Sequence, residues 1–100
     1  MTLAVYRITS TFPKEELFGL TSQLRRAAIS VASNIAEGYG RNSTGEYKQF
    51  LGVARGSNLE LQTQLYIAAK LGYGNPELVQ QTESLSNEVA KMLNTLIAKL

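Results

Sequence analysis

The segment from Leu20 to Gly38, drawn as an α-helix, carries apolar residues around about two thirds of its circumference. One apolar stripe consists of Leu20, Leu24, Ala27, Ala28, Val31 and Ile35. A second stripe, beside Arg25, consists of Ile29, Ala32 and Ala36. A helix on the outside of a monomeric bundle needs an apolar stripe over only about a third of its surface. The segment is therefore either central in its own domain or in contact with another subunit.

The chain before this segment predicts only a short helix. Thr2–Ser10 has helical spacing of its apolar residues. Pro13 ends the pattern, because proline disfavours helix at the preceding residue and has no N–H group to donate. Residues 14–18 predict one further turn. Since the helices that follow are much longer, we expect a bundle in which part of the first helix is missing. Either the chain is a late start or a trimmed version of something longer, or a neighbouring subunit covers the gap.

Two long helices follow, and polar residues mark where each begins. Residues 44–71 start at a capping-box sequence, Ser43–Glu46. Residues 76–100 start with a proline that follows Asn75, a favourable N-cap. These patterns predict an all-α fold, an antiparallel up-and-down four-helix bundle with a short or truncated first helix. The length of 100 residues predicts a single domain, residues 1–100.

The end of the second helix combines an amide, a carboxylate, two glycines and a guanidinium in one run. Its structural candidates are Asn34, Glu37, Gly38, Gly40 and Arg41. We expect the glycines to end the helix with positive φ, and Glu37 to pair with Arg41 across the turn. Asn34 is expected to cap the carbonyl groups that the helix leaves open. The competing hypothesis is a phosphate or carboxylate site, because the next helix offers free N–H groups beside Arg41.

The composition excludes most kinds of catalytic site. The chain has no His, Cys, Asp or Trp, and all eight acidic residues are Glu. This removes the imidazole base, the thiolate nucleophile and the ordinary zinc site, and leaves only Glu for a carboxylate metal site. No pair of Glu has a catalytic spacing, and Ser and Thr have no evident base. We therefore expect no enzyme activity, no catalytic residue, no metal and no cofactor.

The sequence also predicts a cytoplasmic protein that does not enter a membrane. No apolar run approaches the roughly 20 residues that span a bilayer. The start of the chain lacks the cationic and apolar succession of a signal peptide. The absence of Cys is compatible with a reducing compartment.

Positive charge is concentrated in the middle of the chain, although the net charge is only +2. This region predicts nucleic-acid contacts, to RNA or DNA, through Arg26, Arg41, Lys48 and Arg55. Lys48 and Arg55 project to nearly one side of the third helix, and Tyr66 lies further along that side. Basic residues beside an aromatic ring suit a phosphate backbone with stacked bases. The alternative interpretation is ordinary solvated charge.

Two glycines inside the third helix predict close contact with another backbone. Gly52 and Gly56 share one face, and each lowers helix stability by about 1 kcal/mol relative to Ala. Simple tolerance by a long helix is the alternative. Together with the second stripe of the preceding helix, they predict an oligomer interface. Its candidate residues are Arg25, Ile29, Ala32, Gly52 and Gly56.

Two stretches, Phe12–Ala28 and Ser33–Arg41, resemble the bacterial four-helix bundle family named after the 23S rRNA intervening sequence. Gly56–Leu65 and Leu71–Tyr73 continue the resemblance. It implies an antiparallel four-helix bundle that assembles into a ring-like homopentamer. It transfers no catalytic residue, because the family motif carries none. Family members usually have a longer first helix, and the chain departs from that pattern.

The resemblance extends to the accessory variability protein of diversity-generating retroelements, a basic pentamer that binds nucleic acid and a reverse transcriptase. By this analogy we expect a homo-oligomeric nucleic-acid (RNA) binding or assembly module. The alternative is a protein-binding adaptor or structural oligomer without nucleic-acid affinity. This chain is less basic than the retroelement protein.

Overall fold

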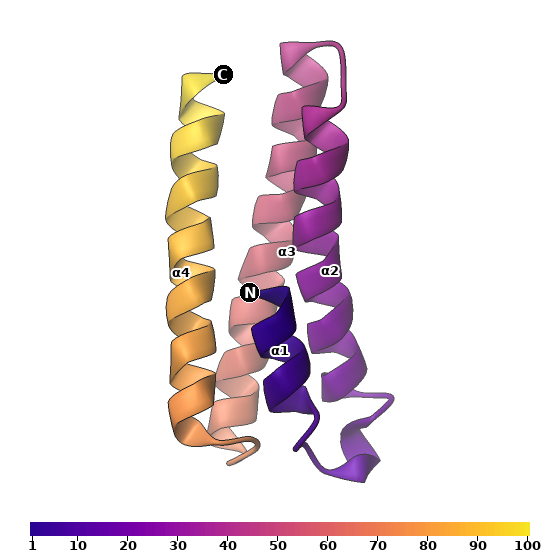
Figure 1. Ribbon diagram of the computed structural model, residues 1–100, viewed down its shortest axis with the longest axis vertical. Helices are drawn as coiled ribbons and strands as arrows, with labels where there is room; N and C mark the ends of the chain where they lie inside the picture. The colour runs from indigo at the N-terminus through magenta and orange to yellow at the C-terminus, as the bar shows by residue number, and fades with distance from the viewer.

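Four α-helices lie side by side and alternate in direction, which confirms the predicted antiparallel bundle (Figure 1). The computed structural model describes all residues from 1 to 100. Its elements are α1 (Thr2–Thr9), the 3-10 turn η1 (Lys14–Glu16), α2 (Leu20–Tyr39), α3 (Thr44–Lys70) and α4 (Pro76–Lys99). The bundle measures 43 × 23 × 17 Å, so its length is set by the three long helices.

Side-chain caps begin the two longest helices, as the sequence predicts. At α3, the Glu46 N–H donates to Ser43 Oγ at 3.1 Å. At α4, Asn75 Oδ1 accepts from the N–H groups of Glu77 and Leu78 at 2.9 and 3.2 Å. These oxygens satisfy N–H groups that have no partner inside the helix, and each cap is worth about 1 kcal/mol.

α1 covers only half of the length of the bundle and thereby divides the core in two. We call the half that α1 covers the closed half, and the remainder the open half (Figure 1). The closed half holds ten buried core residues: Val5, Ile8, Phe12, Leu24, Ala27, Ala28, Leu61, Leu65, Ala68 and Val79. The open half has a cluster of three: Leu51, Ala54 and Leu93. The expectation of a short first helix is thus confirmed, and it leaves a thinner core beyond α1.

The corner between α1, η1 and the α3–α4 loop is closed by aromatic packing. The rings of Phe12 and Tyr73 have centroids 5.6 Å apart. Gly74, with φ of 76°, packs so closely that an added Cβ would lie 3.1 Å from Phe12. The Tyr73 hydroxyl donates to Glu16 Oε2 at 3.1 Å. This hydrogen bond is the main cause that raises the pKa of Tyr73, followed by desolvation and by the negative charges of Glu16 and Glu15.

The expectation that Gly38 and Gly40 end α2 with positive φ is wrong. Only Gly72 and Gly74 have positive φ, whereas Gly40 has φ of −80°. The right-handed helical backbone continues past Tyr39, and the Gly40 N–H donates a hydrogen bond to Ala36 O at 3.3 Å. The helix therefore ends without a residue in the left-handed conformation. Gly38 has a different role, because a Cβ there would lie 2.8 Å from Phe50 Cβ on α3. The absence of a side chain at Gly38 thus lets α2 pack closely on α3.

We predict that Gly38→Ala destabilises the protein by about 1–2 kcal/mol, because the added methyl group forces α2 and α3 apart. The free energy of unfolding in urea measures the effect. Gly45→Ala is the matched control, since a Cβ at Gly45 meets nothing within 4 Å. The control should be neutral or slightly stabilising through helix propensity. Equal behaviour of the two variants would contradict the assigned role of Gly38.

A buried polar pair joins α3 to α4 in the middle of the bundle. The amide nitrogen of Asn58 donates to Ser86 O at 3.0 Å, and Ser86 Oγ donates to Asn58 Oδ1 at 2.9 Å. Both residues are fully buried. Because a buried polar group without a partner is costly, this reciprocal pair fixes the register of α4 on α3.

We predict that Asn58→Ala lowers the free energy of unfolding by about 2–4 kcal/mol. The substitution leaves a cavity and removes both hydrogen bonds of Ser86. Urea denaturation followed by circular dichroism measures the change. Asn87→Ala is the control, because the hydrogen bond of Asn87 to Gln62 is exposed. A loss below about 1 kcal/mol in Asn58→Ala would show that the pair does not determine the packing of α4.

Candidate functional site

The predicted ion pair at the end of α2 is present. Arg41 Nη2 lies 3.0 Å from Glu37 Oε2, and the Arg41 guanidinium lies 4.8 Å from the centroid of the Phe50 ring. The two paired side chains are 44% and 55% exposed, and ion pairs this exposed contribute at most about 1 kcal/mol. The contacts hold the α2–α3 loop and partly neutralise Arg41.

Asn34 does not cap the open carbonyl groups at the end of α2, and that expectation is wrong. Its amide nitrogen donates to Ser30 O at 2.8 Å and lies 3.1 Å from Ser30 Oγ. Ser30 is one turn earlier on the same face and therefore within reach. The hydroxyl of Ser30 is also 2.8 Å from that of Ser57 on α3. Asn34 is thus part of a polar link between the two helices.

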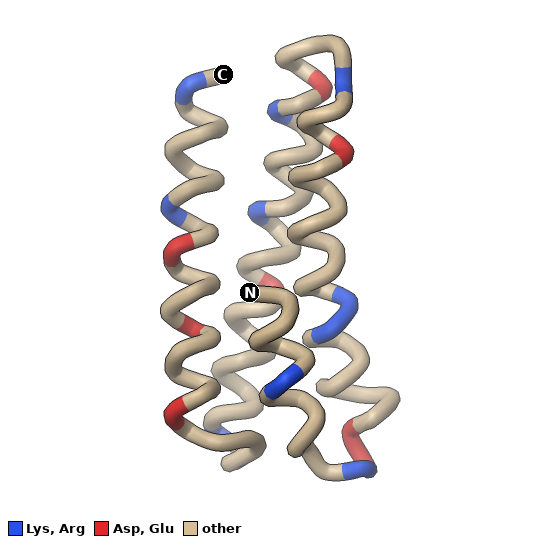
Figure 2. Tube along the Cα trace, viewed as in Figure 1, with Lys and Arg blue, Asp and Glu red and all other residues tan.

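The four basic residues predicted to contact nucleic acid come from three parts of the bundle: Arg26 lies on α2, Arg41 in the α2–α3 loop, and Lys48 and Arg55 on α3. Figure 2 shows the Lys and Arg positions spread along the whole bundle. Arg26 on α2 lies 3.0 Å from Glu60 of α3, so a carboxylate already balances its charge. Lys48 has no carboxylate within 4 Å. Arg55 donates only to Asn94 Oδ1 of α4, at 3.3 Å. Lys48 and Arg55 thus form a basic edge on α3, on the side of α4.

Tyr66 continues along this edge towards the closed half. Its side chain is 62% exposed, and Lys70 Nζ lies 5.3 Å from the centroid of its ring. An exposed ring beside an ammonium group can stack on a nucleobase while the cation contacts a phosphate.

Four of the five residues predicted to form an oligomer interface are exposed at the surface, whereas Arg25 is partly buried and has contacts within the subunit. Ile29 is 45% exposed, and Ala32 is exposed beside it. A Cβ at Gly52 or Gly56 would meet nothing within 4 Å. No neighbour within the subunit therefore explains these glycines. The outer face of α3 also exposes three large apolar side chains, Val53, Leu59 and Ile67.

Arg25, by contrast, has its contacts inside the subunit. Its Nε donates to Thr9 Oγ1 at 2.9 Å, and its guanidinium lies 4.6 Å from the centroid of the Tyr6 ring. These contacts attach α1 to α2. An additional role of Arg25 between subunits stays a prediction.

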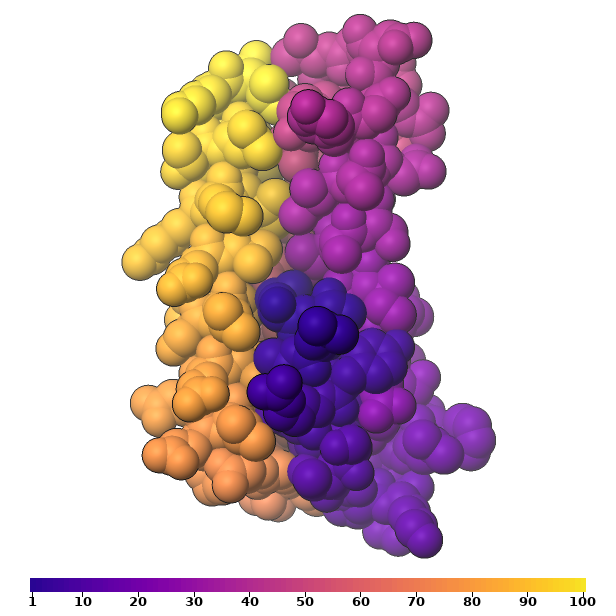
Figure 3. All heavy atoms as spheres, in the orientation of Figure 1, coloured from indigo at the N-terminus to yellow at the C-terminus, as the bar shows by residue number.

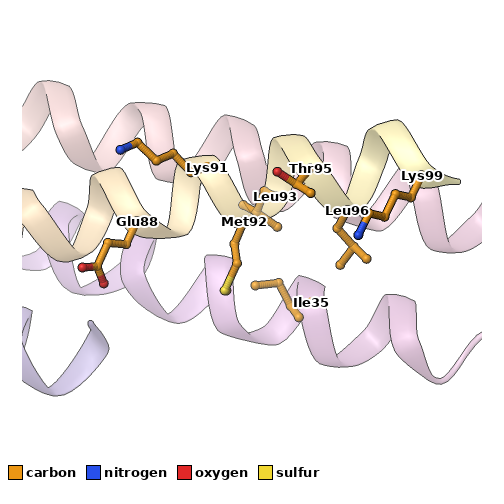
Figure 4. Close-up of a pocket in the computed structure, with 8 residues that line it drawn as sticks. All are labelled: Ile35, Glu88, Lys91, Met92, Leu93, Thr95, Leu96 and Lys99. Atoms are coloured by element: carbon orange, nitrogen blue, oxygen red, sulfur yellow. The ribbon is translucent and has the colours of Figure 1, made fainter.

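An apolar groove in the open half is a feature that the sequence patterns did not reveal. Its volume is about 600 Å³, and it lies between α2 and α4 (Figure 4). Ile35 lines one side, and Met92 and Leu96 line the other. Met92 is 63% exposed although it belongs to an apolar stripe of α4 that includes Val89, Met92, Leu93 and Leu96. The one sequence signal for this groove was the short first helix. The apolar residues of α4 continue into the half of the bundle that α1 does not reach, so they have no partner from α1 there.

The side chains show no further site of the usual kinds. No group of three or more acidic residues lies close enough together to hold a metal ion. None of the helices is both long and apolar enough to cross a bilayer.

The family model of the 23S rRNA-intervening sequence protein matches residues 1–95. The chain belongs to this family. A crystal structure from the S23 ribosomal protein family of Bacteroides thetaiotaomicron, a protein of unknown function, superposes with a TM-score of 0.83 at 21% identity. The match covers 96% of this chain and 87% of that one. At this identity it shows a shared fold. No curated protein matches the chain.

Proposed function

We propose that this member of the 23S rRNA-intervening sequence protein family is a non-enzymatic homo-oligomer that binds nucleic acid, RNA in particular, in the bacterial cytoplasm. The observation that carries the proposal is the basic edge of α3, where neither Lys48 nor Arg55 has a carboxylate partner. The two residues are seven positions apart, or about 10 Å along the helix. The phosphate groups of a nucleic acid would supply the anionic partners that Lys48 and Arg55 do not find within the subunit.

Oligomerisation would give this small edge a useful affinity. One subunit offers few phosphate contacts, so a single copy binds weakly. A ring repeats the edge, and each further contact then becomes an intramolecular event at high effective concentration. The exposed apolar residues on α2 and α3 support self-association, because a contact between subunits would remove their apolar surface from water. The resemblance to the family makes a homopentamer the first choice.

We predict a closed oligomer in sedimentation velocity at micromolar concentration, with five subunits. Gly56→Leu should dissociate it by a steric clash between subunits. The fold of the subunit should persist, because nothing in the subunit lies within 4 Å of a Cβ atom added at Gly56 on this outer face of α3. Circular dichroism checks the fold separately. A wild-type monomer near 11.0 kDa would refute the assembly, and an intact Gly56→Leu oligomer would place the interface elsewhere.

We predict weak, salt-sensitive binding to labelled single-stranded and hairpin RNA in fluorescence-anisotropy titrations. The double variant Lys48→Glu/Arg55→Glu should weaken binding about tenfold or more at low salt and flatten the dependence on salt, since fewer counterions are released. The control Arg7→Glu/Lys14→Glu makes the same charge change on α1 and η1. Little preference between sequences is expected, because phosphate contacts carry no base information.

The two halves of this proposal can fail separately. If the oligomer is intact but binds no RNA or DNA at low salt, the protein-binding adaptor replaces the nucleic-acid function. If the control variant loses as much affinity as the double variant, the binding reflects net charge and the basic edge of α3 has no special role.

A further inference from the structure

A small pocket opens on the seam between α3 and α4, and we call it the seam pocket. Gln62 and Tyr66 of α3 and Glu83 and Asn87 of α4 line it, and its volume is about 180 Å³. In Figure 3 the atoms of α1 lie over α2 and α4, and Figure 1 shows α3 behind them. The seam pocket is thus formed by α3 and α4 alone.

The seam pocket continues the line of the basic edge of α3. Arg55 and Gln62 follow Lys48 at intervals of seven residues, and Tyr66 follows it after eighteen, which is five complete turns of an α-helix. These side chains therefore project to nearly one side of α3. Hydrogen bonds from Arg55 and Gln62 to side chains of α4 show that this side faces the seam. Arg55 and Tyr66 are separated by about 16 Å along the helix, so one short strand of nucleic acid can reach both.

The amide pair in the seam pocket keeps one donor and one acceptor free. Gln62 Nε2 donates to Asn87 Oδ1 at 3.1 Å. Because each amide carries both a carbonyl oxygen and an NH₂ group, Gln62 Oε1 and Asn87 Nδ2 have no partner in the chain. If both amides were turned over, the same two kinds of group would be free. A nucleobase presents donors and acceptors side by side along its edge, so it complements this pair.

Tyr66 and Glu83 decide which part of a nucleotide fits the seam pocket. The Tyr66 ring is 62% exposed, and Lys70, which contacts it from the next turn, does not line the pocket. Ring surface is therefore free for stacking. The Glu83 carboxylate has no ion-pair partner in the chain, so it repels a phosphate group but can accept a hydrogen bond from the amino group of a base. The pocket thus favours the base over the phosphate.

We propose that the seam pocket holds one unpaired nucleobase of a nucleic-acid strand whose phosphates contact Lys48 and Arg55. The base stacks on Tyr66 and meets the amide pair with its edge. In a double helix the faces and the Watson–Crick edge of each base are already occupied. The pocket therefore selects single strands and unpaired loops, and it does so for any base, since every base has a face that stacks. This inference rests on the proposed function and adds the choice between single and double strands.

The test compares one RNA of about 16 nucleotides, free and annealed to its complement, in fluorescence-anisotropy titrations of the intact protein at low salt. We expect the single strand to bind about fivefold more tightly than the duplex, or better. Phosphate contacts alone predict the opposite order, because the duplex has the higher density of negative charge. The sign of the difference therefore separates a site for a base from a purely electrostatic surface.

Variants of the stacking residue test the seam pocket itself. Tyr66→Ala should weaken the single strand about tenfold and leave the duplex unchanged, which removes the preference. Tyr66→Phe keeps the ring and should retain it. Phe18→Ala is the control, because it also removes an exposed ring, 92% accessible, from the turn before α2. Circular dichroism checks that each variant is folded.

Variants of the amides and of the cations separate the two parts of the site. Gln62→Ala/Asn87→Ala should weaken the single strand about fivefold, since two hydrogen bonds to the base edge are lost. The fold should tolerate it, because the hydrogen bond that it removes is exposed. Lys48→Glu/Arg55→Glu should instead weaken both the single strand and the duplex, because both carry phosphates.

Equal affinity for the single strand and the duplex would overturn the seam pocket and leave the proposed function in place. An equal effect of Tyr66→Ala and Phe18→Ala on the single strand would do the same. Binding of AMP as tight as that of the strand would assign the pocket to a free nucleotide and overturn its role on a strand. If neither RNA binds at low salt, the proposed function fails and the pocket fails with it.

Discussion

The packing of α2 on α3 is the interaction on which the rest of the subunit depends. Gly38 brings the two backbones together at the loop end, and the hydroxyls of Ser30 and Ser57 join them in the middle. The Arg26–Glu60 pair follows towards the other end. α1 and α4 then pack on this hairpin from the sides.

α1 packs over one half of the bundle, and the two halves differ in how far their cores are covered. Here the closed half is sealed, and the open half exposes an apolar groove between α2 and α4. The basic edge lies on α3, and the unpartnered glycines lie on the outer face of the same helix. The surfaces that we propose for nucleic acid and for self-association therefore both lie on α3, apart from the groove between α2 and α4.

Local signals in the sequence predicted the elements of the fold closely. Ser43 and Asn75 mark the starts of α3 and α4, because a capping side chain acts on N–H groups two or three residues away. The Glu37–Arg41 pair was predictable for the same reason, since residues four apart on a helix are neighbours. The resemblance to the family added the expected arrangement of the helices, which the family match and the superposed crystal structure bear out.

The candidate sites depended on contacts that no local pattern contains. Four helices, their limits and the short first helix were predictable from the residues alone. The packing of the helices revealed that Gly38 permits close contact with α3 and that the Asn34 amide donates to Ser30 O. It also revealed that Glu60 neutralises Arg26, whereas Lys48 has no carboxylate partner. It also placed Ile35 opposite Met92 across a groove. The physical reason is distance: periodicity and capping act within about one helical turn, whereas charge compensation and burial are set by residues far apart in the chain.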